Sequence, residues 1–385
     1  MPTSANWNYP TSVRFGAGRI AELPKACTVA GMKRPLLVTD PFLATQPMTK
    51  AALESLAAAG LGAAVFSDVK PNPVDANVEA GLAVLRAGKH DGVVAFGGGS
   101  ALDAGKVIAF MAGQVRPMWD FEDVGDWWTR ADPAGIAPVV AVPTTAGTGS
   151  EVGRAGVITQ SATHTKKVIF HPGMMPKVTI CDPALTVGMP AKITAGTGMD
   201  ALAHCLEAYS STFYHPMGDG IAVEGMRLVF ENLETVYRTP GDIDARGHMM
   251  SAAAMGATAF QKGLGAIHAL SHPVGALYDT HHGLTNAVFM PYVLVFNRPA
   301  IEGKIERLAA YCGLTPSFTA FLDKVLALRE ALGVPHTLAG LAVDDGKFDL
   351  MAKMAPEDPT AGGNPLPLDE AAARRLFEQA LSGKL

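Results

Sequence analysis

The sequence is poor in the features that mark secreted, membrane and nucleic-acid-binding proteins. It has four cysteines among 385 residues, all far apart and with no C-x-x-C pair, so neither a disulfide framework nor a thiolate zinc site is expected. Its apolar runs stop well short of the roughly 18 to 20 residues of a membrane span, and Met1 to Tyr9 lacks the basic and apolar segments of a signal peptide. The net charge of −5 provides no basic field for nucleic acid or an anionic membrane. We therefore expect a cytoplasmic protein whose partners are neither nucleic acids nor membranes.

What is present indicates a globular enzyme. Hydrophobic residues make up 48% of the chain and charged residues 17%, which is enough apolar surface to form a core and too little charge for a disordered chain. At roughly 150 residues per domain, the length predicts two or three domains. A protein of this size without a basic surface is best suited to small-molecule substrates.

The first half of the chain alternates short apolar runs with helical stretches. Strand, helix and strand in succession predict a parallel sheet. After Pro190 the strand signals become rare, and helical segments follow one another to the last residue. We therefore predict an α/β domain over residues 1–187 and an all-α domain over residues 188–385. The expected strands are Pro35–Asp40, Ala63–Ser67 and Gly92–Phe96, and the expected helix is Met48–Ala59.

A glycine-rich turn follows the third expected strand. Phe96 to Lys106 reads FGGGSALDAGK, a strand end, three glycines and a helix from about Ser100. Such glycines let the backbone approach a phosphate, and the helix N-terminus offers N–H groups and a positive dipole end to a pyrophosphate. Asp40, which ends an earlier strand, could accept hydrogen bonds from ribose hydroxyls and would repel a 2′-phosphate, which favours NAD over NADP. The alternative is structural, with Ser100 as a helix N-cap and Asp40 as a turn residue.

A second glycine-rich stretch, Pro143 to Ser150 (PTTAGTGS), follows a short expected strand at Val139–Val142. Its hydroxyl groups could bond a phosphate or the nicotinamide amide, whereas the alternative is a polar loop at a strand end. The G-x-G-x-x-G fingerprint is absent after the first strand, so an ordinary Rossmann domain is not expected.

Histidines are concentrated where a metal site could form. Asp200 and His204 are four residues apart in a helical segment, which places a carboxylate and an imidazole on one face. Four of the 11 histidines lie in the segment 263–283, which is otherwise rich in Ala, Leu and Gly. One carboxylate and three imidazoles form a donor set for divalent iron or zinc that leaves a position for a substrate oxygen. Two possibilities remain for His268 and His272, which share a helix face: both bind the metal, or one binds it and the other faces the substrate.

These residues make the chain resemble the iron-containing (group III) alcohol dehydrogenases, whose fold is similar to that of dehydroquinate synthase and glycerol dehydrogenase. The resemblance runs nearly from end to end. It implies a dehydroquinate synthase-like fold, with an α/β N-terminal dinucleotide-binding domain and an all-α C-terminal domain. The motifs that carry it are, in chain order, Phe15-Gly16-Ala17-Gly18, GGGSALDAGK, PTTAGTGSE, DPALTVGMP, GMDALAHCLEAY, HALSHPVGALYDTHHG and Gly363-Asn364-Pro365.

The resemblance also implies roles for individual residues. The implied cofactors are NAD and Fe(II), with zinc left open because the donor set suits both metals. His272 would be the noncoordinating histidine near the nicotinamide, His281 would be incidental, and Lys167 could exchange its role with Lys166. The implied metal ligands are Asp200, His204, His268 and His282. The implied cofactor contacts are Asp40, Gly97, Gly98, Gly99, Ser100, Asp103, Thr144, Thr145, Ser150, Val152, Lys167 and Leu185.

Lys262 departs from the pattern of common family members, which carry a small or amide residue there. A lysine is similar to what 4-hydroxybutyrate dehydrogenases of the family carry. Lys262, with Arg154, is therefore a candidate for holding the distal acid group of an ω-hydroxy acid. The alternative is a solvent-facing lysine on a helix.

The expected function is the reversible, NAD-linked oxidation of a primary alcohol to its aldehyde, with His272 relaying the proton. The main alternative is a metal- and NAD-dependent lyase of the dehydroquinate synthase type, which would produce no net NADH. A metal- or nucleotide-binding sensor without turnover is a third possibility. The expected partners are the alcohol and aldehyde substrates and further copies of the chain, as a homodimer or larger homo-oligomer.

Overall fold

The computed structural model describes residues 11–385, so the Met1 to Tyr9 segment considered above lies outside the described residues. The chain divides into two compact units. The α/β unit contains the described residues up to Thr145 together with Gly149–Val187, and the helical unit contains Ala146–Thr148 and Gly188–Leu385. None of the helices within residues 11–385 combines the length and the apolar composition that a membrane span requires.

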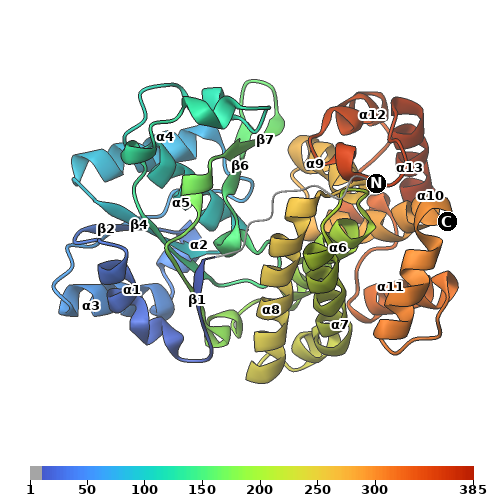
Figure 1. The fold of residues 1–385 in the computed structure, drawn as a ribbon, viewed down its shortest axis with the longest axis horizontal. Helices are drawn as coiled ribbons and strands as arrows, with labels where there is room; N and C mark the ends of the chain where they lie inside the picture. Colours follow the sequence, from blue (N-terminus) through green and yellow to red (C-terminus); the bar gives the residue numbers. More distant parts are fainter. Residues whose placement is uncertain (1–10) are drawn as a thin grey trace. The chain divides into compact units, whose positions relative to one another are not determined.

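A parallel sheet forms the centre of the α/β unit (Figure 1). Its strand order is β1-β8-β5-β4-β2-β3, and every neighbouring pair is parallel. After β2 the chain adds β3 on one side and then returns to add β4 on the other, so the strand order reverses between β2 and β4. In open parallel sheets a ligand binds at such a switch point, beyond the carboxyl ends of the strands. The strands are β1 (Ser12–Phe15), β2 (Pro35–Val38), β3 (Ala64–Phe66), β4 (Gly92–Gly97), β5 (Val139–Pro143) and β8 (Val178–Cys181).

Both faces of this sheet are covered by helices, which explains why its central strands are continuously apolar. Alternate residues of β2 point to opposite faces: Leu36 and Val38 pack with α4 (Asp75–Ala87) and α5 (Gly99–Met111), whereas Leu37 packs with α1 (Leu23–Val29) and α3 (Pro47–Ala58). Figure 1 shows α4 and α5 on one side of the sheet and α1 and α3 on the other. The strand ends between these layers are thus fixed by two separate hydrophobic cores.

The strands predicted near residues 35, 63, 92 and 139 are confirmed, as is the helix predicted at 48–59. The prediction missed β1, β8 and an antiparallel hairpin, β6 (Ala155–Gln160) with β7 (Thr165–Phe170). The alternative that made Ser100 a helix N-cap is wrong, because α5 already begins at Gly99 with Gly98 in the N-cap position.

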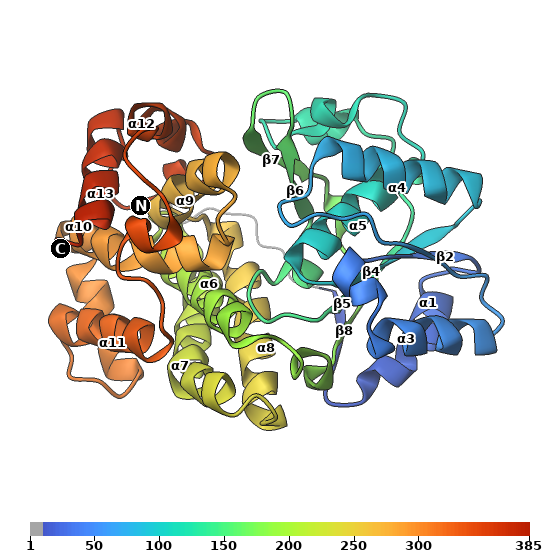
Figure 2. The ribbon, with the colours of Figure 1, turned by 180° about the vertical axis from the view of Figure 1, so that it is seen from behind.

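The helical unit is organised around α6 (Ala191–Ser210), which packs against α7, α8 and α10 (Figure 2). Every residue of α6 from 198 to 210 is buried, so its polar side chains must find partners inside the protein. The prediction of a mostly helical C-terminal half is confirmed. The other helices are α7 (Pro216–Arg238), α8 (Ile243–Ala259), α9 (Ala266–Tyr278), α10 (His282–Tyr311), α11 (Phe318–Ala331), α12 (Phe348–Glu357) and α13 (Glu370–Ser382).

Candidate active site

The glycine-rich turn lies at the carboxyl end of β4, next to the switch point of the sheet. Gly97 has a φ of +146°, and a Cβ atom there would lie 2.8 Å from the Ala101 Cβ, so the turn requires glycine. None of the described side chains caps the α5 N-terminus at Gly98. The first N–H groups of α5 are therefore the kind of donor set that accepts a pyrophosphate.

Asp40 follows β2 on the other side of the switch point. One of its carboxylate oxygens accepts a hydrogen bond from the amide of Leu43 at 2.9 Å and caps the short helix α2 (Pro41–Ala44). A single oxygen suffices for this cap, so the second is available to ribose hydroxyls.

Asp103 and Ser150, both expected to contact the cofactor, bond to each other. The Ser150 hydroxyl donates to Asp103 Oδ1 at 2.5 Å, and the Val157 amide donates to Asp103 Oδ2 at 3.0 Å. Beneath them the buried Lys106 ammonium donates to the Ser150 carbonyl at 2.9 Å. These bonds join α5 to the second glycine-rich loop and to β6, and they give Asp103 a part in shaping the loop.

Of the remaining predicted cofactor residues of the α/β unit, Thr144, Thr145 and Leu185 follow strand ends of the parallel sheet, whereas Lys167 lies in the separate β6–β7 hairpin. The Thr144 amide donates to the Gly97 carbonyl at 2.9 Å, which places Thr144 and Thr145 directly after β5 beside the glycine-rich turn. Leu185 lies in the 3-10 turn Pro183–Thr186 that follows β8. Val152 is buried in the 3-10 turn Ser150–Val152, and Lys167 on β7 is ion-paired with Glu122 at 2.7 Å.

The four predicted metal ligands come together in the helical unit. Asp200 and His204 lie one turn apart on α6, His268 lies in the first turn of α9, and His282 is the first residue of α10. Ligand atoms of the first three lie within 4.8 Å of one another, and all three residues are buried. Asp200 Oδ1 lies 3.9, 3.8 and 3.6 Å from the Nε2 atoms of His204, His268 and His282.

The donor set fits a divalent cation. The Asn286 Nδ2 lies 2.8 Å from Asp200 Oδ1 and 3.2 Å from Nε2 of both His268 and His282. The NH2 group of Asn286 has two hydrogens, so it cannot donate a separate hydrogen bond to the Asp200 oxygen and to both imidazole nitrogens, whereas one cation can bind all three atoms. Burial lowers the pKa of His204, which favours the neutral imidazole that a metal requires.

Two carboxylates that the sequence analysis missed hold the imidazoles of α9. His268 Nδ1 lies 2.5 Å from Glu207 Oε2, and His272 Nδ1 lies 2.7 Å from Asp358 Oδ2. Burial alone would lower the pKa of His268, but the carboxylates of Glu207, Asp200 and Asp358 together outweigh burial and raise it. Burial alone would raise the pKa of Asp358, but His272 and the hydrogen bonds from Thr360 lower it. Each Nδ1 faces a carboxylate, which leaves Nε2 as the reactive atom of each ring.

The other two histidines of the cluster have hydrogen-bond partners outside the four predicted ligands. The His272 ring stacks on that of His282 at 5.4 Å between centroids, next to the proposed metal but with its own carboxylate partner. His281 occupies the N-cap position of α10, where its Nδ1 accepts from the Leu284 amide at 3.4 Å. His281 therefore has a structural role at the helix start.

The two candidate acid-binding cations have different surroundings. Lys262 is 3% exposed, and its ammonium forms an ion pair with Asp219 and donates to the Tyr209 carbonyl at 3.2 Å. It is therefore not a solvent-facing lysine, and it already has a carboxylate partner in Asp219. Arg154, in the α/β unit, has its guanidinium 5.4 Å from the centre of the Phe170 ring, and burial lowers its pKa.

Comparison with known proteins identifies the family. The models described as iron-containing alcohol dehydrogenase and as the C-terminal part of the Fe-containing alcohol dehydrogenase family match residues 10–183 and 194–381. A 4-hydroxybutyrate dehydrogenase of Cupriavidus necator is 38% identical over 97% of this chain and 99% of its own. A 1,3-propanediol dehydrogenase of Klebsiella pneumoniae is 38% identical over 95% of this chain and 96% of its own.

Solved structures agree with these relatives. A crystal structure of a 1,3-propanediol oxidoreductase matches with a TM-score of 0.92 and 36% identity, covering 98% of this chain and 100% of the other. A sulfoacetaldehyde reductase from Bifidobacterium kashiwanohense, in complex with NAD+, matches with a TM-score of 0.89 and 28% identity, covering 99% of this chain and 100% of the other. These matches favour a dehydrogenase over a lyase of the dehydroquinate synthase type. The chain belongs to the iron-containing alcohol dehydrogenase family.

Proposed function

We propose that this dehydrogenase interconverts primary alcohols and aldehydes with NAD, and that it holds a divalent iron with Asp200, His204, His268 and His282. The observation that carries the proposal is the convergence of one carboxylate oxygen and three imidazole nitrogens, with distances of 3.6 to 3.9 Å from Asp200 Oδ1. Since α6 is buried over this part, such a polar cluster is costly unless a cation completes it. The donor set also suits zinc.

The proposed metal and the residues around it would have separate roles in the reaction. A metal ion bound there supplies a Lewis acid for the substrate oxygen. Oxidation transfers a hydride from the alcohol carbon to the nicotinamide and releases the hydroxyl proton. We assign this proton to His272 Nε2, because Asp358 occupies Nδ1 and the His272 side chain is 13% exposed, so the proton can pass on to solvent. The variant His272→Ala should keep its metal and lose turnover, and unchanged turnover would remove this role.

The cofactor is proposed to bind at the strand ends of the α/β unit. The first turn of α5 would take the pyrophosphate, and Asp40 would take the ribose hydroxyls and select NAD. The support for this assignment is the position of both groups at the switch point of the sheet.

The substrate is proposed to be an ω-hydroxy acid such as 4-hydroxybutyrate. One relative that matches nearly the whole chain is named as a dehydrogenase of that acid. Arg154 and Lys262 are the candidate anchors for the distal carboxylate. Each cation has a carboxylate nearby, Asp219 beside Lys262 and Asp123 beside Arg154, so both remain candidates and the variants described below decide between them.

An anaerobic initial-rate assay of the Fe(II)-loaded enzyme tests the substrate. NADH formation is compared for 4-hydroxybutyrate and for neutral primary alcohols of matched length, including 1,3-propanediol. A preference for the acid supports the proposal, and a preference for the neutral alcohols makes this a general alcohol dehydrogenase. The matched variants Arg154→Met and Lys262→Met identify the residue that holds the carboxylate. Replacing that residue should reduce kcat/KM for the acid about 10- to 100-fold and leave kcat/KM for the neutral alcohols unchanged.

Oligomeric state and location complete the proposal. We infer a homodimer or larger homo-oligomer, the default for an enzyme of this size, which light scattering on the purified protein can measure. We also infer a cytoplasmic location, which the four cysteines support because all are free thiols.

A further inference from the structure

The N-terminus of α9 is held by side chains from distant parts of the chain. Gly265 precedes α9 and offers no capping side chain. Instead, the Ala266 amide donates to Asn364 Oδ1 at 3.1 Å and the Ile267 amide donates to Glu207 Oε1 at 2.6 Å. Because α9 carries both His268 and His272, these two bonds fix the helix that presents both imidazoles.

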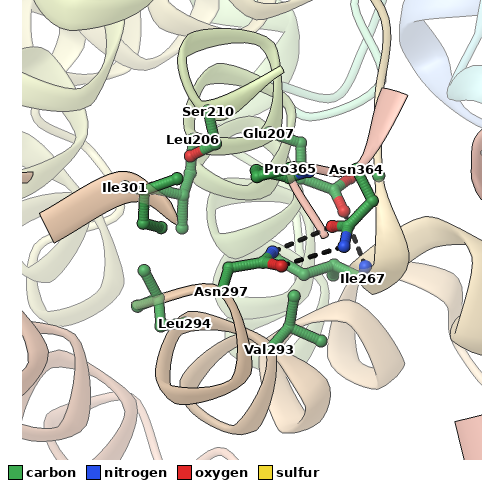
Figure 3. Close-up of a pocket in the computed structure, with 11 residues that line it drawn as sticks. Leu206, Glu207, Ser210, Ile267, Val293, Leu294, Asn297, Ile301, Asn364 and Pro365 are labelled. Carbon is green, nitrogen blue, oxygen red and sulfur yellow. Dashed lines mark hydrogen bonds between the residues drawn. The ribbon is translucent and has the colours of Figure 1, made fainter. Parts of the chain in front are cut away.

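Asn364 is itself fixed by a reciprocal pair of hydrogen bonds. Asn297 Nδ2 donates to Asn364 Oδ1 at 2.8 Å, and Asn364 Nδ2 donates to Asn297 Oδ1 at 2.9 Å. Figure 3 shows this pair beside Glu207 and Ile267, in a small pocket whose remaining lining is mainly apolar, with side chains such as Leu206 and Val293. Hydrogen bonds in such an apolar setting are strong and direct, and water cannot easily replace them.

The fit around the α9 start is tight. A Cβ atom at Gly265 would lie 2.9 Å from Asn364 Oδ1 and 3.1 Å from Glu207 Oε1. The polar groups thus approach the helix backbone at a position that only glycine leaves open. This contact gives a role to the Gly363-Asn364-Pro365 motif, which the chemistry of the reaction does not use.

Glu207 faces two hydrogen-bond donors at once. Its Oε1 accepts from the Ile267 amide, which can only donate, and its Oε2 lies 2.5 Å from His268 Nδ1. A carboxylate accepts at both oxygens and so holds Nδ1 of His268 in the protonated form. The Nε2 lone pair then points to the cluster formed with Asp200 and His282.

We propose that Glu207 is a positioning residue for the metal site, because it fixes the tautomer and the direction of the His268 ring. The Asn297–Asn364 pair holds the start of α9 in the position where the Glu207 and His268 side chains make contact. This inference rests on the metal site of the proposed function. It requires a carboxylate at position 207, because a carboxamide has one acceptor oxygen for two donors. In Glu207→Gln the NH2 group of the side chain must face either the Ile267 N–H or His268 Nδ1. In the first arrangement two donors face each other. In the second, His268 Nδ1 must accept, which places the ring proton on Nε2, the nitrogen proposed to bind the metal.

The test measures metal affinity in Glu207→Gln without using activity. The probe is Co(II), bound in competition with a chelator and followed by its visible spectrum, and apo-protein folding is checked by circular dichroism. We expect 10- to 100-fold weaker Co(II) binding and an altered spectrum, the usual effect of losing a carboxylate behind a ligating histidine. The surface variant Glu224→Gln, which removes a carboxylate bonded to Arg227, is the matched control and should bind Co(II) like the wild type.

The possible results separate a failure of the Glu207 inference from a failure of the proposed metal site. Wild-type Co(II) affinity and spectrum in Glu207→Gln would overturn the inference. If that variant does not fold, Asn297→Ala decides: weaker Co(II) binding by the folded protein supports the inference, and unchanged binding contradicts the role of the asparagine pair in holding the site. Failure of the wild-type protein to bind Co(II) or Fe(II) would instead contradict the proposed function itself.

Discussion

At the scale of single residues, the proposed site depends on imidazoles that are held at one nitrogen and used at the other. His268 and His272 lie one turn apart on α9, yet one is proposed to bind the metal and the other to move a proton. Both rings have a carboxylate at Nδ1, Glu207 for His268 and Asp358 for His272. The difference lies at Nε2, which in His268 is 3.8 Å from Asp200 Oδ1.

Asp358→Asn tests whether the carboxylate orients His272. Asp358 Oδ1 accepts from the Thr360 amide at 2.9 Å, so an asparagine that keeps this bond turns its NH2 group to His272 Nδ1. We therefore expect kcat to fall about 10- to 100-fold with little change in metal content, because the Nδ1 proton of the ring loses its acceptor. Steady-state kinetics of Asp358→Asn, His272→Ala and the double variant provide the measurement. If Asp358 acts through His272, the double variant is no slower than His272→Ala alone, and additive losses would show that it does not.

Asp40→Asn tests the basis of cofactor choice. Asparagine keeps the N-cap of α2, since it accepts from the Leu43 amide as aspartate does, but it removes the negative charge. We expect the ratio of kcat/KM for NADP to that for NAD to rise at least tenfold, with an unchanged melting temperature. An unchanged ratio would mean that another group selects the cofactor.

Some residues of the proposed site could be predicted from the sequence, and others could not. Asp200 and His204 are one helical turn apart, so local spacing was enough to pair them. Glu207 continues the same face of α6, a signal that could have been used. Asp358 is 86 residues from His272 and carries no local signal of that contact, so only the fold could reveal it.

At the scale of elements, the turn between β4 and α5 is the part proposed to bind the cofactor pyrophosphate. Gly97→Ala should raise KM for NAD and destabilise the protein by about 1–3 kcal/mol, because an L side chain is strained at this φ and would press on Ala101. Gly60→Ala is the matched control: its φ is +76° with nothing within 4 Å of the added Cβ. Titration with NAD should show weaker binding only in Gly97→Ala, and equal loss of NAD affinity in both variants would contradict the proposal.

Two of the missed elements, β1 and the β6–β7 hairpin, share a physical cause. β1 is an edge strand of four residues with an exposed, mixed pattern, so neither alternation nor a buried run marks it. The β6–β7 hairpin carries Lys166 and Lys167 on partly exposed positions, which weakens its apolar signal. The buried strands β2 and β4 were predictable because helices cover both of their faces and demand continuous apolar residues.

At the scale of the whole molecule, the buried side chain of Glu151 should make the free energy of unfolding depend on pH. Burial raises the pKa of Glu151 to about 7, above the value of 4.5 for an exposed glutamate. The native state therefore binds this proton more tightly than the unfolded state, and the resulting stabilisation is lost progressively as the pH rises from about 4.5 through 7. We expect a loss of about 1 kcal/mol between roughly pH 6 and pH 8 from this group alone.

Glu151→Gln should remove this contribution. Urea denaturation of wild type and variant at both pH values measures it, and the difference between the two proteins isolates Glu151 from other titrating groups. An equal pH dependence in both proteins would show that Glu151 is already ionised in the native state.

The central claim is that iron at the Asp200 and histidine cluster is required for NAD-linked alcohol oxidation. The most direct measurement follows NADH formation from a primary alcohol, and iron content, in one anaerobic preparation before chelation, after chelation and after Fe(II) is added back. We expect NADH formation to disappear with the iron and to return with it, and not to return in His204→Ala. NADH formation at an undiminished rate by the iron-free protein would show that the reaction does not need the metal.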